Sequence, residues 1–283
     1  MGTKLASACG FILFLFASAM TVTQAKNLKD VEITDEFPVD RCADNPGLVT
    51  SCLGADCNEY LPLIEGRVWL LDNSECDDCD EDEAVAVSIL GDTELVDDEL
   101  TRVMEEREWV DGELAEVSRN FVNQCSNTQD VYYWGEDVCV DPDSEDVLEG
   151  DPIAGHFNCA LILDDEAEPA GLTYGSGAWR AGIGGAEPGI LFPGGAFLLG
   201  ATYFQEIDED AQDWATNEEM GLTADNPADG EFTECVLVLD RNLLEDPKGK
   251  EADEKVYCPG IGIVQDEELE LTSCEDLAGV CAQ

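Results

Sequence analysis

The sequence predicts an all-β protein: a single large curved antiparallel sheet or half-barrel that disulfides hold together. Three observations support this prediction. Short apolar and β-branched runs are separated by turn residues, Asp111-Gly112 is a strong hairpin signal, and an even number of cysteines follows an export-type leader. A Gly-rich loop and one or two short helices complete the predicted fold.

Residues 1–25 have the three-part layout of a secretory signal peptide. Lys4 precedes an apolar run over residues 11–16, and we expect cleavage after Ala25, with Ala19 as the alternative. The apolar run is shorter than the ~20 residues of a membrane-spanning helix. We therefore expect a secreted or periplasmic protein without a transmembrane anchor. Residues 26–58 would form a Cys-containing N-terminal segment, and residues 59–283 would form the β-sheet domain.

The chain has 13 cysteines, and one of them, Cys9, lies in the leader. An even number in an oxidising compartment predicts up to six disulfides. Three candidate pairs are local, Cys52 with Cys57, Cys76 with Cys79 and Cys274 with Cys281, and the remaining pairing stays open. A redox or zinc motif at Cys76 and Cys79 is disfavoured, because the acids around it oppose a thiolate. The disulfide candidates are Cys42, Cys52, Cys57, Cys76, Cys79, Cys125, Cys139, Cys159, Cys235, Cys258, Cys274 and Cys281.

Ten segments have the composition of strands. In chain order they are Arg67–Leu71, Ala84–Leu90, Arg102–Trp109, Glu113–Asn123, Val131–Trp134, Thr202–Ile207, Glu234–Leu239, Lys255–Tyr257, Ile261–Val264 and Leu269–Leu271. The last four predict an antiparallel meander. Thr101–Glu108 also contains good helix formers, so a helix is the alternative there, and a short helix is expected around Asp210–Glu219. Residues 171–200 carry ten of the 26 glycines and predict an ordered loop between strands.

The chain is extremely acidic, with 65 Asp and Glu against 13 Lys and Arg and a net charge of −52. This charge excludes nucleic acid and anionic membrane surfaces as partners, because it repels phosphate. A surface of this kind suits a halophilic environment, since concentrated salt screens its self-repulsion. The same carboxylates predict, as an alternative, divalent-cation binding with Ca²⁺ as the candidate ion. The metal candidates are Asp77, Asp78, Asp80, Asp82, Asp141 and Asp143.

A calcium loop that begins at Asp141 lacks two required residues, because Asp146 replaces the turn Gly and Pro152 replaces the closing Glu. No other cofactor is indicated. A non-enzymatic binding or cell-envelope role is favoured, in which a curved sheet holds an apolar, amphipathic or lipid-like small molecule. The candidate ligand-binding residues are Trp134, Trp179, Phe192, Tyr203 and Phe204, and the alternative is that these aromatics only fill the core.

An enzyme is less favoured. A serine triad would need His156, the sole histidine, and Ser176 sits in a Gly-rich turn without the strand-to-helix elbow. A hydrolase with carboxylate catalysis remains a second alternative, because among 65 acids any two can meet and their abundance identifies no particular pair.

Several segments in this order resemble a family of uncharacterised secreted β-rich proteins of environmental bacteria and archaea. They include Trp109–Leu114, Val131–Glu136, Gly177–Gly182, Gly185–Ile190, Tyr203–Glu206 and Tyr60–Leu63 with Gly66 and Trp69. Tyr257–Val264 is similar to the closing strand pair of periplasmic lipoprotein carriers of the LolA kind. The resemblance implies a β-rich exported domain and brings no catalytic residue or cofactor. Cys125 and Cys258 depart from the family pattern, which indicates that their disulfides are peculiar to this branch.

Overall fold

The computed structural model describes residues 42, 47–74, 76, 79, 81–144, 146–163, 169–208, 212–228, 230–242, 249 and 252–281. All of them belong to the compact unit Thr34–Gln283. The described chain is all-β, and its only helical elements are two 3-10 turns, η3 (Gly54–Asp56) and η4 (Cys159–Leu161). The predicted fold class is confirmed.

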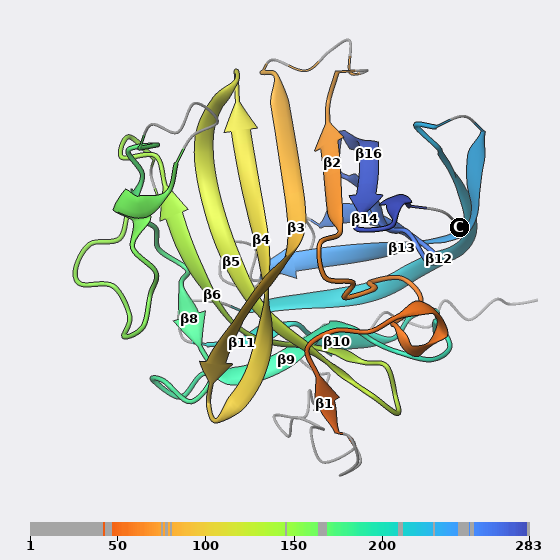
Figure 1. The fold of residues 1–283 in the computed structure, drawn as a ribbon, viewed down its shortest axis with the longest axis horizontal. Coiled ribbons are helices and arrows are strands. Elements are labelled where there is room, and N and C mark those ends of the chain that lie inside the picture. The colour runs from red at the N-terminus through yellow and green to blue at the C-terminus, as the bar shows by residue number, and fades with distance from the viewer. Residues whose placement is uncertain are drawn as a thin grey trace, which may run out of the picture. The chain divides into compact units, whose positions relative to one another are not determined.

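The first half of the sheet is an antiparallel meander in which each strand pairs with the next (Figure 1). Its strands are β2 (Val68–Asp72), β3 (Glu83–Val96), β4 (Glu99–Val110), β5 (Glu113–Cys125) and β6 (Val131–Val140). Asp111 and Gly112 form the turn between β4 and β5, both with positive φ, as the hairpin signal predicts. The helical alternative for Thr101–Glu108 is therefore wrong.

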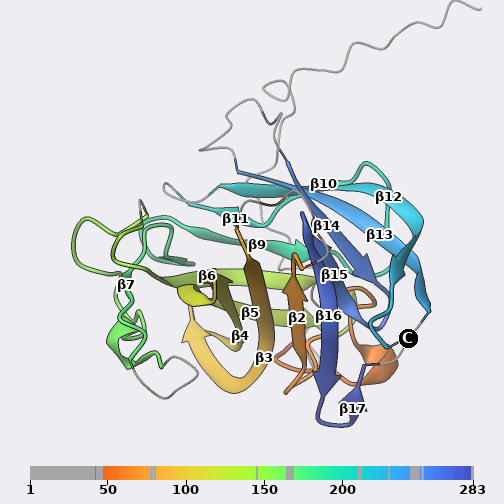
Figure 2. The same cartoon turned by 90° about the horizontal axis from the view of Figure 1, so that it is seen from above.

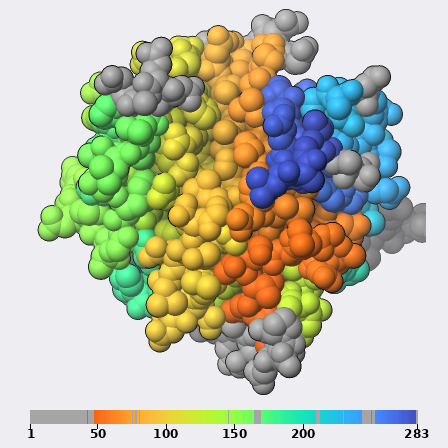
Figure 3. Space-filling view, viewed as in Figure 1, coloured from red at the N-terminus to blue at the C-terminus, as the bar shows by residue number. Residues whose placement is uncertain are grey.

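The second half is the predicted C-terminal meander, extended by one strand at its start. It contains β12 (Asp213–Asp225), β13 (Glu231–Asn242), β14 (Asp253–Cys258), β15 (Gly262–Asp266) and β16 (Leu269–Asp276), and β17 (Gly279–Val280) pairs with β16. Because β16 also pairs with β2, the two halves form one sheet. Figure 3 shows the two ends of the described chain, coloured orange and blue, side by side on one face.

The sheet nearly closes on itself at residues 202–207. β10 (Thr202–Phe204) pairs with β12, while β11 (Glu206–Ile207) pairs with β9 (Glu187–Phe192), which in turn pairs with β6. One short stretch of chain therefore connects both halves. Figure 2 shows the resulting arrangement, in which β12 and β13 face β4, β5 and β6 across the interior.

Two expectations about local structure need correction. The helix expected around Asp210–Glu219 is wrong, because residues 213–217 form strand β12, which pairs with β13 on one side and β10 on the other. Tertiary pairing overrides the local helix propensity there. The Gly-rich segment 171–200 also contains three short strands, β7 (Thr173–Tyr174), β8 (Trp179–Arg180) and β9, all paired with β6.

All twelve candidate cysteines pair with one another. The three local pairs are confirmed, and the others are Cys42–Cys125, Cys139–Cys159 and Cys235–Cys258. The described part of the N-terminal segment is joined to the sheet, because β1 (Leu48–Val49) pairs with β5 and Cys42 is bonded to Cys125. Among the described residues, no helix has the length and apolar character to cross a bilayer.

Candidate functional site

A cavity of about 220 Å³ lies on the inner side of the sheet. Its walls are of two kinds, one acidic and one apolar. The acidic residues are Glu106, Glu116, Glu136, Glu206, Asp213, Asp240 and Asp266, and the apolar residues are Leu61, Trp69, Val87, Met104, Leu191 and Ile263. Lys255 is the only basic residue among the described residues that line it, and Ser118, Asn120, Gln205, Tyr133 and Tyr257 complete the lining.

Strand pairing explains why one wall is apolar and the next acidic. Directly opposed residues on neighbouring strands point to the same face of a sheet. One such row runs from Trp69 on β2 through Val87 on β3 and Glu106 on β4 to Ser118 on β5. The character of the inner face therefore changes from apolar to polar between β3 and β4.

The neighbouring row repeats this change one step along the strands. It runs from Leu71 through Val85 and Glu108 to Glu116. Glu136 on β6 extends the acidic wall, because it is opposed to Asn120 on β5. Four glutamates on three adjacent strands thus face the interior.

The opposite acidic wall comes from the strands near the closure of the sheet. It consists of Glu206 on β11, Asp213 on β12 and Asp240 on β13. Glu206 is only 5% exposed. Oδ1 of Asp240 is buried and has no hydrogen-bond partner among the described residues. A buried acceptor of this kind is costly unless something donates to it.

Lys255 on β14 neutralises one end of the cavity. Its Nζ lies 3.1 Å from Asp266 Oδ2 and 4.0 Å from Asp240 Oδ2. Burial alone would lower the pKa of Lys255, but the carboxylates of Asp266 and Asp240 outweigh burial and raise it well above the ordinary value. The ammonium group is therefore firmly charged.

Three of the glutamates in the lining have a raised pKa and hold their protons more tightly than usual. Burial, together with the carboxylates of Glu136 and Glu106, raises the pKa of Glu116 to about 8. Burial and Glu106 raise the pKa of Glu136 to about 8 as well. Burial and Asp213 raise the pKa of Glu206 well above its ordinary value. Such groups resist ionisation unless a cation lies beside them.

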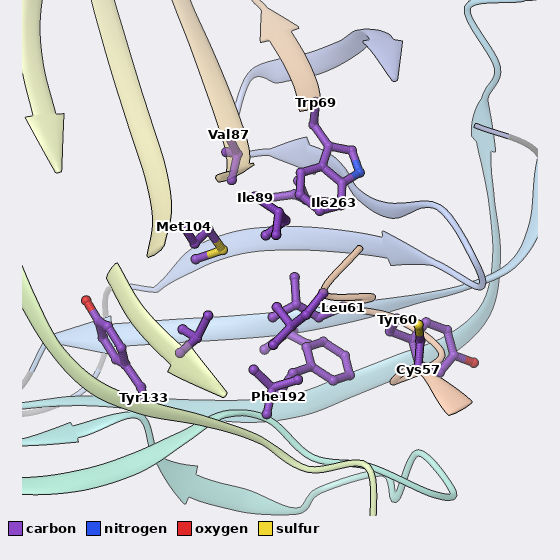
Figure 4. Close-up of a cluster of buried hydrophobic side chains, with 14 of the residues drawn as sticks. Cys57, Tyr60, Leu61, Trp69, Val87, Ile89, Met104, Tyr133, Phe192 and Ile263 are labelled. Carbon is purple, nitrogen blue, oxygen red and sulfur yellow. The ribbon is translucent and has the colours of Figure 1, made fainter. Parts of the chain in front are cut away.

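The apolar wall is a tight cluster of side chains from four strands. Figure 4 shows Trp69, Val87, Met104 and Ile263 gathered together, with Tyr133 lying apart from them. The Trp69 indole is fully buried and its Nε1 donates to the carbonyl of Ile261 at 2.8 Å. This wall is therefore rigid and offers no oxygen ligands of its own.

A second hollow of about 290 Å³ adjoins the first and shares Glu106, Lys255 and Asp266 with it. Its other walls include Glu83, Glu108, Asp253 and the β15–β16 turn residues Glu267 and Glu268, of which several are exposed. The Lys255 side chain thus lies between an inner cavity and a more exposed, acidic one.

None of the five predicted aromatic residues lines either hollow. Trp134 and Trp179 are buried, and their rings pack in the core, where Trp134 Nε1 donates to Asn123 Oδ1 and Trp179 packs edge-on against Tyr133. Phe192 is buried against Tyr60 and Tyr257, and Tyr203 and Phe204 are half-buried on β10. A ligand-binding role for these residues stays a prediction.

The predicted metal residues that the structure describes do not line the cavity. Asp77, Asp78 and Asp80 lie outside the described residues, and Asp82 is exposed. Asp141 and Asp143 are also exposed, and Asp141 Oδ1 accepts a hydrogen bond from the Asp143 amide at 2.7 Å. This is a local Asx turn, which already engages one carboxylate oxygen.

His156 is part of a small cluster with Cys139 and Cys159. The two cysteines form a disulfide, so they cannot act as thiolate ligands. The imidazole lies against β6, with Nδ1 2.7 Å from the carbonyl of Phe157 and Nε2 near the Val138 backbone. Its contacts fix a loop to the sheet.

Sequence reasoning missed the acidic cavity. In a chain with 65 acids, alternate glutamates in a strand do not indicate which face of the sheet is inward, because outward-facing positions are acidic too. The one available signal was Lys255, a lysine within a predicted strand of a lysine-poor chain.

No protein-family model matches the chain, and comparisons with curated proteins and with solved structures give no match either.

Proposed function

We propose that the protein is an exported, non-enzymatic binding protein that holds a small cation in the inner cavity. The observation that carries this proposal is the charge imbalance of the lining, in which seven carboxyl groups surround a single ammonium group. A bound cation offsets the cost of ionising these buried carboxyl groups, which otherwise keep their protons. The ligand is small, since 220 Å³ lies below the ~300–1,000 Å³ of ordinary ligand pockets.

Export follows from the leader and the cross-links. Residues 1–25 have the layout of a signal peptide, and six disulfides are typical of proteins from oxidising compartments. The acidic surface suits a saline medium. Kinship with the exported β-rich family and with LolA-like carriers stays a prediction.

A divalent cation such as Ca²⁺ is the second candidate. Ca²⁺ takes six to eight oxygen ligands. Glu116, Glu136 and Glu206 bring carboxylates to one part of the cavity, and Ser118 and Asn120 add neutral oxygens.

Isothermal titration calorimetry with CaCl₂, MgCl₂, KCl and small ammonium salts tests the proposal. We expect at least one of these cations to bind the wild-type protein, and Glu206→Gln to weaken binding by tenfold or more. Glu218→Gln is the matched control, because Glu218 is an exposed acid on β12. If no cation binds, or if the control variant weakens binding as much as Glu206→Gln, the proposal is wrong.

A further inference from the structure

We propose that the bound cation is an organic primary ammonium with a short apolar body, the charged end between Glu206 and Asp240 and the body against Trp69, Val87 and Met104. This inference rests on the proposed function and names the ligand class. It follows from the two unlike walls of the cavity, from the lysine already bound there and from the unpartnered oxygen of Asp240.

The two walls fit the two parts of such a ligand. A bare metal ion needs only oxygen ligands and a hydration shell, and gains nothing from Trp69, Val87, Met104 and Ile263. A purely apolar ligand would offer the buried polar groups of the acidic wall no hydrogen-bond partner. An alkylammonium or arylammonium ion satisfies both walls at once.

The chain itself provides an example of this recognition. The side chain of Lys255 is an alkylammonium group inside the cavity, with its Nζ 3.1 Å from Asp266 and 4.0 Å from Asp240. The same lining thus already binds an ammonium ion at one end. Glu206, only 5% exposed, lies in the part of the lining to which the described chain contributes no basic residue.

Asp240 lines the cavity together with Glu206, and Asp213 interacts electrostatically with both of them. Its Oδ2 is the oxygen near Lys255 and Gln205 also donates to the carboxyl group of Asp240, whereas the Oδ1 of Asp240 is buried and has no hydrogen-bond partner among the described residues. An ammonium group has three donors. A ligand ammonium between Asp240 and Glu206 therefore supplies the missing donor and pairs with both carboxylates.

The volume of the inner cavity and its position beside the outer hollow both suit a small ligand. The inner cavity holds about 220 Å³ and adjoins the outer hollow of about 290 Å³, from which it is separated by Glu106, Lys255 and Asp266. A cation that enters this way passes the acidic residues of the outer hollow before it reaches the apolar wall. A long acyl chain exceeds the available volume.

The test is a calorimetric titration of the wild-type protein with methylammonium, ethylammonium, propylammonium and benzylammonium chloride. We expect affinity to rise roughly fourfold per added methylene, because each buries apolar surface against the apolar wall. Benzylammonium should bind at least tenfold more tightly than its neutral counterpart, benzyl alcohol, and benzoate should not bind.

Two variants locate the charged end. Glu206→Gln and Asp240→Asn should each weaken benzylammonium binding by tenfold or more, whereas Glu218→Gln should leave it within twofold. The chain-length series uses only the wild-type protein, so it remains decisive if a variant fails to fold.

The outcomes separate the two proposals. If Ca²⁺ or K⁺ binds but the ammonium series shows no rise with chain length, the organic ligand is wrong and cation binding stands. If benzyl alcohol binds as tightly as benzylammonium, the organic ammonium ligand is wrong, and the metal-ion titrations decide the proposed function. If neither metal ions nor ammonium ions bind, both proposals fall together.

Discussion

Replacement of Glu136 by Gln should stabilise the protein at alkaline pH. Glu136 faces the cavity from β6, and Ser118 donates a hydrogen bond to its carboxyl group. Burial and the nearby Glu106 raise the pKa of Glu136 from its ordinary 4.5 to about 8. Gln has nearly the same shape, retains an acceptor for Ser118 and never ionises.

The sign of the effect follows from proton linkage. Between pH 4.5 and pH 8 the folded state holds the Glu136 proton while the unfolded state releases it, so the free energy of unfolding falls as pH rises. Each pKa unit corresponds to about 1.4 kcal/mol, which sets an upper limit of about 5 kcal/mol. Partial exposure of Glu136 reduces this, so we expect Glu136→Gln to gain about 1–3 kcal/mol at pH 8 and almost nothing at pH 4.5.

Urea unfolding at pH 4.5, 6, 7 and 8 measures this difference, with ionic strength held constant. Glu218→Gln is the control for simple removal of one surface charge, and it should change stability by less than about 0.5 kcal/mol at every pH. The reasoning is refuted if Glu136→Gln is no more stable than wild type at pH 8, or if its gain is independent of pH.

Three further predictions concern stability. The melting temperature should rise steadily from dilute buffer to molar NaCl, because salt screens repulsion within a chain of net charge −52, and a flat response in a thermal melt would contradict this. Replacing both Cys42 and Cys125, which are 83 residues apart, by Ser should lower the free energy of unfolding by about 4 kcal/mol in denaturant unfolding. The same replacement of Cys76 and Cys79 should lower it by only about 2 kcal/mol, because a shorter loop constrains the unfolded chain less. Equal losses for the two pairs would contradict this. Gly189→Ala should cost about 3 kcal/mol or more by the same measurement, because its Cβ would overlap the backbone oxygen of Gln205 at the closure of the sheet. A loss below about 1 kcal/mol would show that the two strands separate easily.

The local elements were largely predictable because they depend on local chemistry. Asp111-Gly112 tolerates the positive φ that a tight turn needs, and alternation in Ala84–Leu90 identifies a strand with one buried face. The local cysteine pairs follow from short separations, and the pairings Cys42–Cys125 and Cys235–Cys258 required the fold. The helix expected near Asp213 failed because pairing with β10 on one side and β13 on the other outweighs the local helix propensity.

The sequence by itself determined the strand content, the cross-linking cysteines and the strongly negative charge, all of which are properties of single residues or short segments. Only the tertiary structure decided that Glu206, Asp240 and Lys255 share one cavity with Trp69 and Val87. These residues lie up to 186 positions apart, and they meet because β2 pairs with β16 and the sheet returns to its own edge at residues 202–207. Which of many acids faces inward depends on strand register, and register is fixed by pairing across the sheet.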